Sequence, residues 1–229
     1  MIRNYQSLVT LIRMKIFTDN LQGTREYFHE KGIIFEIEDK FFSLKSEENG
    51  NRSELSEICD IGLIYKNKTL VAYKGIKEET VSLNELKSRQ DVTFDQTSTY
   101  FEILNGKNIY MFWDEETAFW HFSDDTRINS PYESIMKKTL YNILAFEPFF
   151  TYCFKIVEKG ENSGIYLDSM YDTVKGKEIA WDTVDQYAGR FKVKAPKRFM
   201  YDEFKEIEES DLPIGIKDKF GRRFFITSI

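Results

Sequence analysis

The sequence has few of the residues that mark secreted, metal-binding or membrane-spanning proteins. It contains 2 cysteines, 2 histidines and 4 prolines in 229 residues. Cys59 and Cys153 are too few for a disulfide framework, and such sparse cysteine use is typical of a reducing compartment. No apolar run approaches the roughly eighteen residues of a membrane helix, and the first residues form no apolar signal segment. We therefore expect an intracellular, cytoplasmic protein without a membrane partner.

An excess of positive charge is also absent. The chain has 32 Lys and Arg against 38 Asp and Glu, which gives a net charge of −6. No overall positive field attracts nucleic acid, so such binding requires a local basic surface. Metal ligands are not clustered either, because His121 has no second histidine to join it, and the acidic runs 114–116 and 124–125 are typical of solvated turns. We expect no metal site.

Aromatic side chains, by contrast, are abundant. The 20 Phe and 13 Tyr account for most of an aromatic fraction of 16%, which favours a sheet-rich globular protein over a disordered one. The length allows one large domain. We expect a single α+β domain over residues 1–229, in which residues 1–52 form an N-terminal subregion packed on the rest.

The segment 93–113 carries the strongest local signal. Asn105-Gly106 separates two runs rich in β-branched and aromatic residues, and both turn residues tolerate the positive φ of a type I′ turn. The pattern predicts a β-hairpin at the centre of the chain.

Other elements follow from periodicity and turn chemistry. Apolar spacing predicts helices at residues 5–17 and 20–32, and the capping box Ser130-Pro131-Tyr132-Glu133 begins a helix that ends before Pro148. The apolar run 149–157 predicts a buried strand, the polar segment 78–90 a surface connection, and the acidic segment 201–209 a helix. Residues 190–194 alternate cations with apolar residues, as strands do. Further strands are expected at 33–37, 41–44, 61–65, 69–73, 117–122, 165–167, 178–181, 214–216 and 224–226.

The order of these elements, from about residue 35 to 227, resembles the adenylation domain of the covalent nucleotidyltransferases. That superfamily contains RNA ligases, DNA ligases and mRNA capping guanylyltransferases, and the nearest branch is that of phage-type RNA ligases that repair tRNA. Ile58-Cys59-Asp60-Ile61-Gly62-Leu63-Ile64 and Leu83-Asn84-Glu85 are similar to two segments that precede the nucleophile of these ligases. Thr93-Phe94-Asp95-Gln96-Thr97 stands where they have Lys-x-Asp-Gly-Ser. The resemblance implies an antiparallel-sheet-rich α+β fold with a few flanking helices.

The motif positions hold residues that differ from those the family's chemistry needs. Thr93 replaces the lysine whose amine attacks the α-phosphate, and a hydroxyl of much higher pKa does not substitute for it. Lys155 stands where the family has a carboxylate for the ribose, and residues 112–115 are acidic where the family is basic. The C-terminal hairpin, 214–227, lacks the metal-binding glutamate and both closing lysines. Because the chain ends at this motif, the resemblance implies no separate C-terminal ligase domain.

These departures predict a catalytically inactive RNA ligase-like protein that acts as a binding or scaffolding subunit with a protein partner. We expect no catalytic residue and no cofactor. The richness in Lys, Ile, Asn, Phe and Tyr favours a phage or viral source and a virus-associated location. Two alternatives stay open. One is an active nucleotidyltransferase with an atypical nucleophile, which would use ATP or GTP with Mg, and the other is an unrelated α+β structural or interaction protein.

Two groups of residues are candidates for contact with nucleotide or RNA. The resemblance assigns Thr93, Asp95 and Lys155 to the family's nucleotide pocket, although Asp95 also fits an ordinary turn residue. A basic stretch predicts contacts with phosphates or, alternatively, a solvated face. Its cations are Arg190, Lys192, Lys194, Lys197 and Arg198.

Overall fold

The computed structural model describes most of the chain from Leu21 onward and arranges it around three sheets. The described residues are 21–47, 53, 56, 59, 62–66, 69–75, 78–90, 92, 95–140, 142–160, 162–205, 213–218 and 222–228. The expected helix at 5–17 and the motif residue Thr93 lie outside them. No helix among the described residues is long and apolar enough to cross a membrane.

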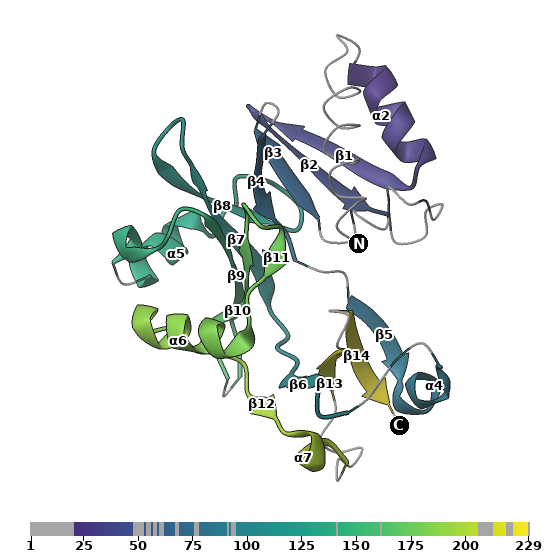
Figure 1. Cartoon of the computed structure of the whole chain (residues 1–229). Coiled ribbons are helices and arrows are strands. Elements are labelled where there is room, and N and C mark those ends of the chain that lie inside the picture. The colour runs from purple at the N-terminus through teal and green to yellow at the C-terminus, as the bar shows by residue number, and fades with distance from the viewer. Residues whose placement is uncertain are drawn as a thin grey trace.

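The upper sheet is a four-stranded antiparallel meander covered by one helix (Figure 1). Its strands run in sequence order, and helix α2 (Leu21–Glu30) packs on β1 and ends before Gly32, whose φ is +69°. The strand pairs expected in this region are confirmed, because β1 pairs with β2 and β3 pairs with β4 in antiparallel register. The strands are β1 (Ile33–Glu38), β2 (Phe41–Ser46), β3 (Leu63–Lys66) and β4 (Thr69–Tyr73).

The central sheet holds the main core. Its order is β11-β10-β9-β7-β8, and all 8 residues of the middle strand β9 (Phe150–Val157) are buried, which confirms the expected buried strand. Helix α6 (Trp181–Phe191) packs on β10. The remaining elements of this layer are β7 (Lys107–Asp114), β8 (Phe119–Asp124), α5 (Glu133–Thr139), the 3₁₀ turn η1 (Ile143–Ala145), β10 (Gly164–Asp172) and β11 (Lys177–Glu178).

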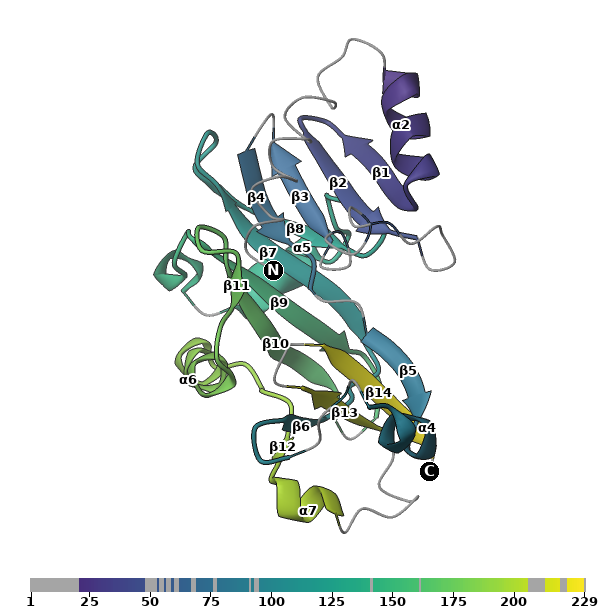
Figure 2. The same ribbon diagram turned by 45° about the vertical axis from the view of Figure 1, so that its right-hand side comes forward.

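The lower sheet joins segments that are far apart in the sequence (Figures 1 and 2). Its order is β12-β6-β13-β14-β5, and β14 and β5 are parallel. The expected pairing of the last two strands is confirmed. The elements are β5 (Glu78–Ser82), α4 (Leu83–Ser88), β6 (Thr99–Glu102), β12 (Arg198–Phe199), α7 (Tyr201–Lys205), β13 (Ile214–Lys217) and β14 (Arg223–Ser228).

The hairpin predicted around Asn105-Gly106 is wrong. Strand β6 pairs with β12 and β13 in the lower sheet, whereas β7 pairs with β8 and β9 in the central sheet. The dipeptide therefore lies in the crossing from one sheet to the other. A Cβ atom on Gly106 would lie 2.4 Å from the carbonyl oxygen of Ile156, so glycine is needed here for close approach of two backbones and not for a tight turn.

Three other predictions fail for related reasons. The segment 78–90 is not a surface connection, because β5 and α4 bury Val81, Leu83 and Leu86 against the lower sheet. The capping box at Ser130 does not form, since Tyr132 is the N-cap of α5 without a side-chain bond. The strand expected at 190–194 is wrong for the most part, because Arg190 and Phe191 end α6, which buries Trp181, Val184, Ala188 and Phe191 at helical spacing, and only Lys194 forms a β-bridge. The strand expected at 178–181 is confirmed only at Glu178, the last residue of β11.

Candidate functional site

A small cleft lies where the three sheets meet. We call it the inter-sheet cleft. The end of β4 brings side chains from the upper sheet, β7, β9 and β10 from the central sheet, and the start of β14 from the lower sheet. Its volume is about 50 Å³. The lining residues are Lys74, Gly75, Asn108, Tyr110, Cys153, Phe154, Lys155, Asp168, Ser169 and Arg223.

Positive charge exceeds negative charge in this lining. Lys74, Lys155 and Arg223 are all buried, with exposed fractions of 7%, 8% and 4%. Asp168 is the one carboxylate among the lining residues, and it accepts a hydrogen bond of 3.1 Å from Nη1 of Arg223. Among the residues that the structure describes, neither lysine forms an ion pair. Because a buried charge without a counterion is costly, the cleft has the electrostatic character of an anion site.

Lys74 is the most unusual of the three cations. It directly follows β4, and its backbone N–H donates to the carbonyl of Gly62 at 2.7 Å. Burial lowers the pKa of Lys74, against the attraction of Glu36 and Asp125. Burial disfavours the charged form of Lys74, and an anion that enters the cleft restores a large part of the stabilisation of that charged form.

A network of buried ion pairs closes one side of the cleft. We call it the ionic cluster: Arg223, Asp168, Glu178 and Lys217. Nη2 of Arg223 lies 2.8 Å from Oε1 of Glu178, and Nζ of Lys217 lies 2.7 Å from Oε2 of the same carboxylate. Burial opposes ionisation of both acids, but the nearby cations together outweigh it: Arg223 and Lys155 lower the pKa of Asp168, and Arg223 and Lys217 lower that of Glu178. The ionic cluster joins the lower sheet to the central one.

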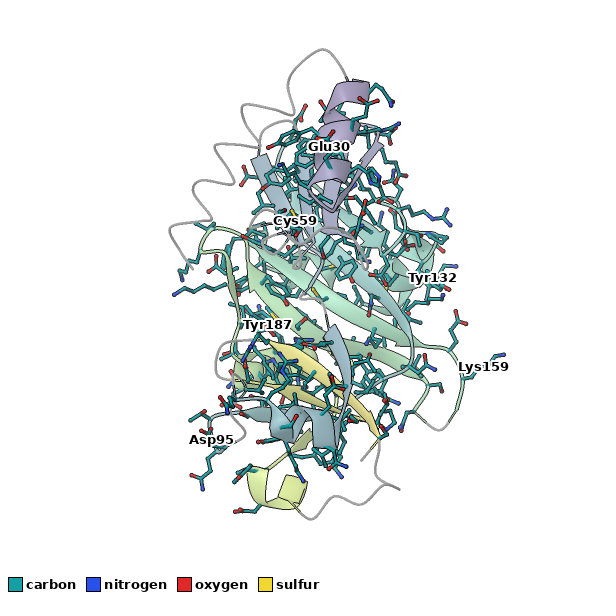
Figure 3. The ribbon with its side chains drawn as sticks, turned by 90° about the vertical axis from the view of Figure 1, so that its right-hand side faces the viewer. Glu30, Cys59, Asp95, Tyr132, Lys159 and Tyr187 are labelled. Carbon is teal, nitrogen blue, oxygen red and sulfur yellow. The ribbon has the colours of Figure 1, made fainter. Side chains whose placement is uncertain are left out.

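The structure brings one of the predicted site residues to the cleft. Lys155 lines it, with its Nζ 5.9 Å from the centre of the Phe225 ring. Asp95 does not line it. Its carboxylate accepts hydrogen bonds from the backbone and hydroxyl of Thr97 in the loop before β6, and Figure 3 shows it at the lower end of the molecule, near α4.

The cations of the basic stretch differ in their contacts and exposure. Arg190 lies 3.7 Å from Glu147, and Nζ of Lys194 donates to the carbonyl of Ser163. The guanidinium of Arg198 lies over the Trp181 ring at 3.8 Å and 3.3 Å from Asp185, so it is part of the interior. Lys192 and Lys197 are exposed. Arg190, Lys194 and Arg198 therefore contact protein groups, and a contact of the stretch with phosphates stays a prediction.

Sequence reasoning missed three residues of the cleft: Lys74, Asp168 and Arg223. Each left a weak signal, because each stands at or within an apolar strand pattern where a charged side chain is out of place. The strand 69–73 runs directly into Lys74-Gly75, and Arg223 precedes Phe224-Phe225-Ile226. A charge in such a position is costly unless it is paired or bound. A charged residue in an apolar strand pattern therefore indicates an ion pair or a binding site.

The fold is that of the nucleotidyltransferase domain of ATP-dependent ligases, as expected from the sequence. An archaeal ATP-dependent RNA ligase superposes with a TM-score of 0.61 at 11% identity, covering 96% of this chain and 64% of that one. A putative ATP-dependent DNA ligase from Aquifex aeolicus gives 0.62 at 13%, covering 91% and 62%. The chain thus spans less than two thirds of the length of these ligases. No protein-family model matches the sequence, and no curated protein does, so the likeness shows the fold alone.

Proposed function

We propose that the protein uses a ligase fold to bind a phosphate-bearing ligand, nucleotide or RNA, and acts as a binding or scaffolding subunit without ligating. The observation that carries this proposal is the excess of buried positive charge in the inter-sheet cleft, where three cations face one carboxylate. The replacement of the expected lysine by Thr93 supports the absence of lysyl-nucleotide chemistry. The protein partner and the viral source remain predictions.

The size of the cleft supports binding of a phosphate group rather than of a whole nucleoside. A volume of about 50 Å³ exceeds the roughly 30 Å³ that one water takes in the liquid, and it is far below the ~300 Å³ of ordinary ligand pockets. The ionic cluster holds the lower sheet against the central sheet at this point. A nucleoside would therefore have to lie outside the cleft or open it.

The first test is covalent labelling. We expect that incubation with α-labelled ATP or GTP and Mg leaves no acid-labile adduct on the protein, because no lysine stands at position 93. A stoichiometric adduct would contradict the inactive assignment.

The second test is calorimetric binding of inorganic phosphate, AMP and ATP. Removing one buried cation by Lys155→Met is expected to weaken phosphate binding roughly tenfold, since a charge-assisted hydrogen bond contributes about 1.5 kcal/mol or more. Lys138→Met, which changes an exposed lysine of α5, is the matched control and should bind as the wild type does. Equal affinities for the two variants, or no binding by the wild type, would exclude the cleft as the site.

One observation favours the second candidate, an active nucleotidyltransferase with an atypical nucleophile. The lowered pKa of Lys74, caused by burial, increases the neutral fraction of an amine that faces the cleft. Such an amine can attack the α-phosphorus of a nucleoside triphosphate, forming a P–N bond as the bond to pyrophosphate breaks. If labelling gives an adduct, Lys74→Arg should abolish it and Lys138→Arg should not.

RNA contact by the basic stretch is tested separately. The double variant Lys192→Glu, Lys194→Glu is expected to weaken binding of short RNA and to reduce its salt dependence, because each lost phosphate contact lowers the number of released counterions. Unchanged RNA affinity assigns the stretch to a solvated face.

The likeness of the fold to ATP-dependent ligases favours a protein that binds nucleotide or RNA over an unrelated α+β structural protein.

A further inference from the structure

A second and larger hollow lies on another part of the surface. We call it the acidic groove. It has a volume of about 600 Å³ and is open to solvent. Strand β4, the end of β7, the segment before β9 and the turn after β10 form its walls. The lining residues are Lys66, Leu70, Val71, Trp113, Asp114, Glu115, Glu116, Pro148, Phe149, Thr173 and Val174.

The walls of the acidic groove combine exposed apolar surface with net negative charge. Phe149 and Val174 line it and expose 44% and 81% of their surface, so a partner that binds there removes this apolar surface from water. Three carboxylates and one ammonium group line it. Lys66 neutralises Asp114 and also contacts Glu116, whereas Glu115 is exposed and forms no ion pair with a described residue. A cationic side chain beside an apolar one is the matching ligand.

The acidic groove is preformed. Val71 is the extra residue of a bulge in β4, which shifts the register between β3 and β4 and disfavours addition of another strand at this edge. The turn at the end of β7 is held by Asp114, which accepts from the backbone of Glu116 and the hydroxyl of Thr117. The turn after β10 is held in the same way by Asp172. A partner therefore binds through side chains, without ordering these turns.

A surface of matching chemistry is present on the same chain. From Arg190 to Met200 there are five cations and no acidic residue. Lys197 is exposed and forms no ion pair with a described residue, and its Nζ lies 4.7 Å from the centre of the Phe199 ring. Met200 exposes 73% of its surface. This part of the chain, around β12, offers a cation and an apolar side chain that match the carboxylates and the apolar surface of the acidic groove.

The two surfaces lie at different ends of the molecule. Figures 1 and 2 both show β12 and α7 at the bottom, whereas β4 and the tip of the β7–β8 hairpin are in the upper half. The basic segment of one molecule therefore does not reach its own acidic groove. We infer that a second copy of this chain docks its Lys197–Met200 surface in the acidic groove. The contact joins two different surfaces, so the association is head to tail and generates rings or filaments.

Sedimentation velocity over a series of protein concentrations tests this inference. The wild type is expected to show an average mass that rises with concentration beyond that of a dimer, and to dissociate in high salt. A groove variant, Glu115→Lys with Val174→Ser, should remain monomeric. A segment variant, Lys197→Glu with Met200→Ser, should do the same. All four positions are exposed, so the fold is retained.

Mixing the two variants gives the decisive result. Each variant keeps one intact surface, so an equimolar mixture should form a complex of two chains and nothing larger. The charge-swapped chain, Glu115→Lys with Lys197→Glu, should regain the association of the wild type. A wild type that stays monomeric at all concentrations, or a mixture that does not associate, overturns the inference. If the segment variant binds RNA more weakly and the mixture does not associate, Lys197 contacts RNA. This result also overturns the inference. These results do not depend on the proposed function of the inter-sheet cleft.

Discussion

At the scale of single residues, the pair Lys66 and Asp114 is the most deeply buried ion pair in the described part of the chain. Nζ of Lys66 lies 2.5 Å from Oδ2 of Asp114, and the two side chains are only 5% and 3% exposed. Lys66 ends β3 and Asp114 ends β7, so the pair joins the upper sheet to the central sheet. Glu116 adds a second contact of 2.7 Å to the same ammonium group.

Removing one partner leaves the other charge buried. We expect Asp114→Asn to lower the free energy of unfolding by about 2 kcal/mol, the typical cost of losing a hydrogen bond to a charged group. Urea denaturation measures this. Glu115→Gln, at the exposed neighbouring position, is the control and should leave the unfolding free energy unchanged at protein concentrations where the chain is monomeric. Equal stabilities of the two variants would show that the pair contributes nothing.

The same pair predicts a pH dependence. Burial opposes the charged form of Asp114, but hydrogen bonds from Lys66 and Thr117 outweigh it and lower its pKa below the ordinary 3.8. The stabilisation is therefore present above pH 3.8 and is lost as the pH falls through the lower pKa of the folded state. The bonds to Asp114 and Glu116 likewise outweigh burial and raise the pKa of Lys66 above 10.5, so its contribution is present below pH 10.5 and is lost above the raised value.

The measurement is the difference in unfolding free energy between wild type and Asp114→Asn across this pH range. His121 also responds to Asp114, because its Nε2 lies 3.6 Å from Oδ2 of Asp114 and burial lowers its pKa below the ordinary 6.5. The difference should therefore be constant between about pH 7 and pH 9, above the titration of His121, and should shrink at both extremes. A difference that does not shrink in acid would contradict the lowered pKa of Asp114.

At the scale of elements, the crossing from β6 to β7 depends on one glycine. The backbone of Gly106 approaches that of Ile156 in β9 so closely that a Cβ atom would lie 2.4 Å from the carbonyl oxygen. Backbone atoms cannot move aside as the end of a flexible side chain can. The glycine therefore sets the position at which β7 enters the central sheet.

We expect Gly106→Ala to destabilise the protein by about 1–3 kcal/mol, the usual cost of overpacking. The matched control is Gly189→Ala in α6, where an added Cβ meets nothing within 4 Å. It should raise the unfolding free energy by about 0.5–1 kcal/mol, because alanine loses less backbone entropy in a helix. Thermal denaturation of both variants measures the contrast, and a stabilising Gly106→Ala would show that β7 can shift without cost.

At the scale of the whole molecule, the ionic cluster holds two sheets together. Arg223 is the first residue of β14 in the lower sheet, and its partners Asp168 and Glu178 belong to β10 and β11 in the central sheet. Arg223→Met should cost about 3 kcal/mol, because two carboxylates then stay buried without their partner. Hydrogen exchange of the β13 and β14 amides should quicken more than that of β9.

An exposed ion pair is the control for that prediction. Lys137 pairs with Glu133 within α5, and their side chains are 45% and 40% exposed, so Lys137→Met should cost less than about 1 kcal/mol. Equal losses for Arg223→Met and Lys137→Met would mean that the contact between the sheets adds nothing to stability.

The local parts of this fold follow from the amino-acid sequence. Hairpins with short turns, such as β1–β2 and β3–β4, were predictable because each strand's partner is its neighbour in the chain. The buried strand β9 was predictable because its apolar run has no other stable environment. The likeness of element order to a ligase adenylation domain was visible for the same reason, although at the residue level it brought only Lys155 to the inter-sheet cleft.

Which strands share a sheet, and which charges meet, depends on long-range packing. Asn105-Gly106 has the composition of a hairpin turn, yet burial of β6 against β13 and of β7 against β9 separates the two strands. Lys74, Lys155 and Arg223 come together because three sheets converge, and no spacing in the chain encodes that convergence. Nonlocal burial outweighs local turn preference here, since the apolar surface it removes from water contributes several kcal/mol and a turn preference about one.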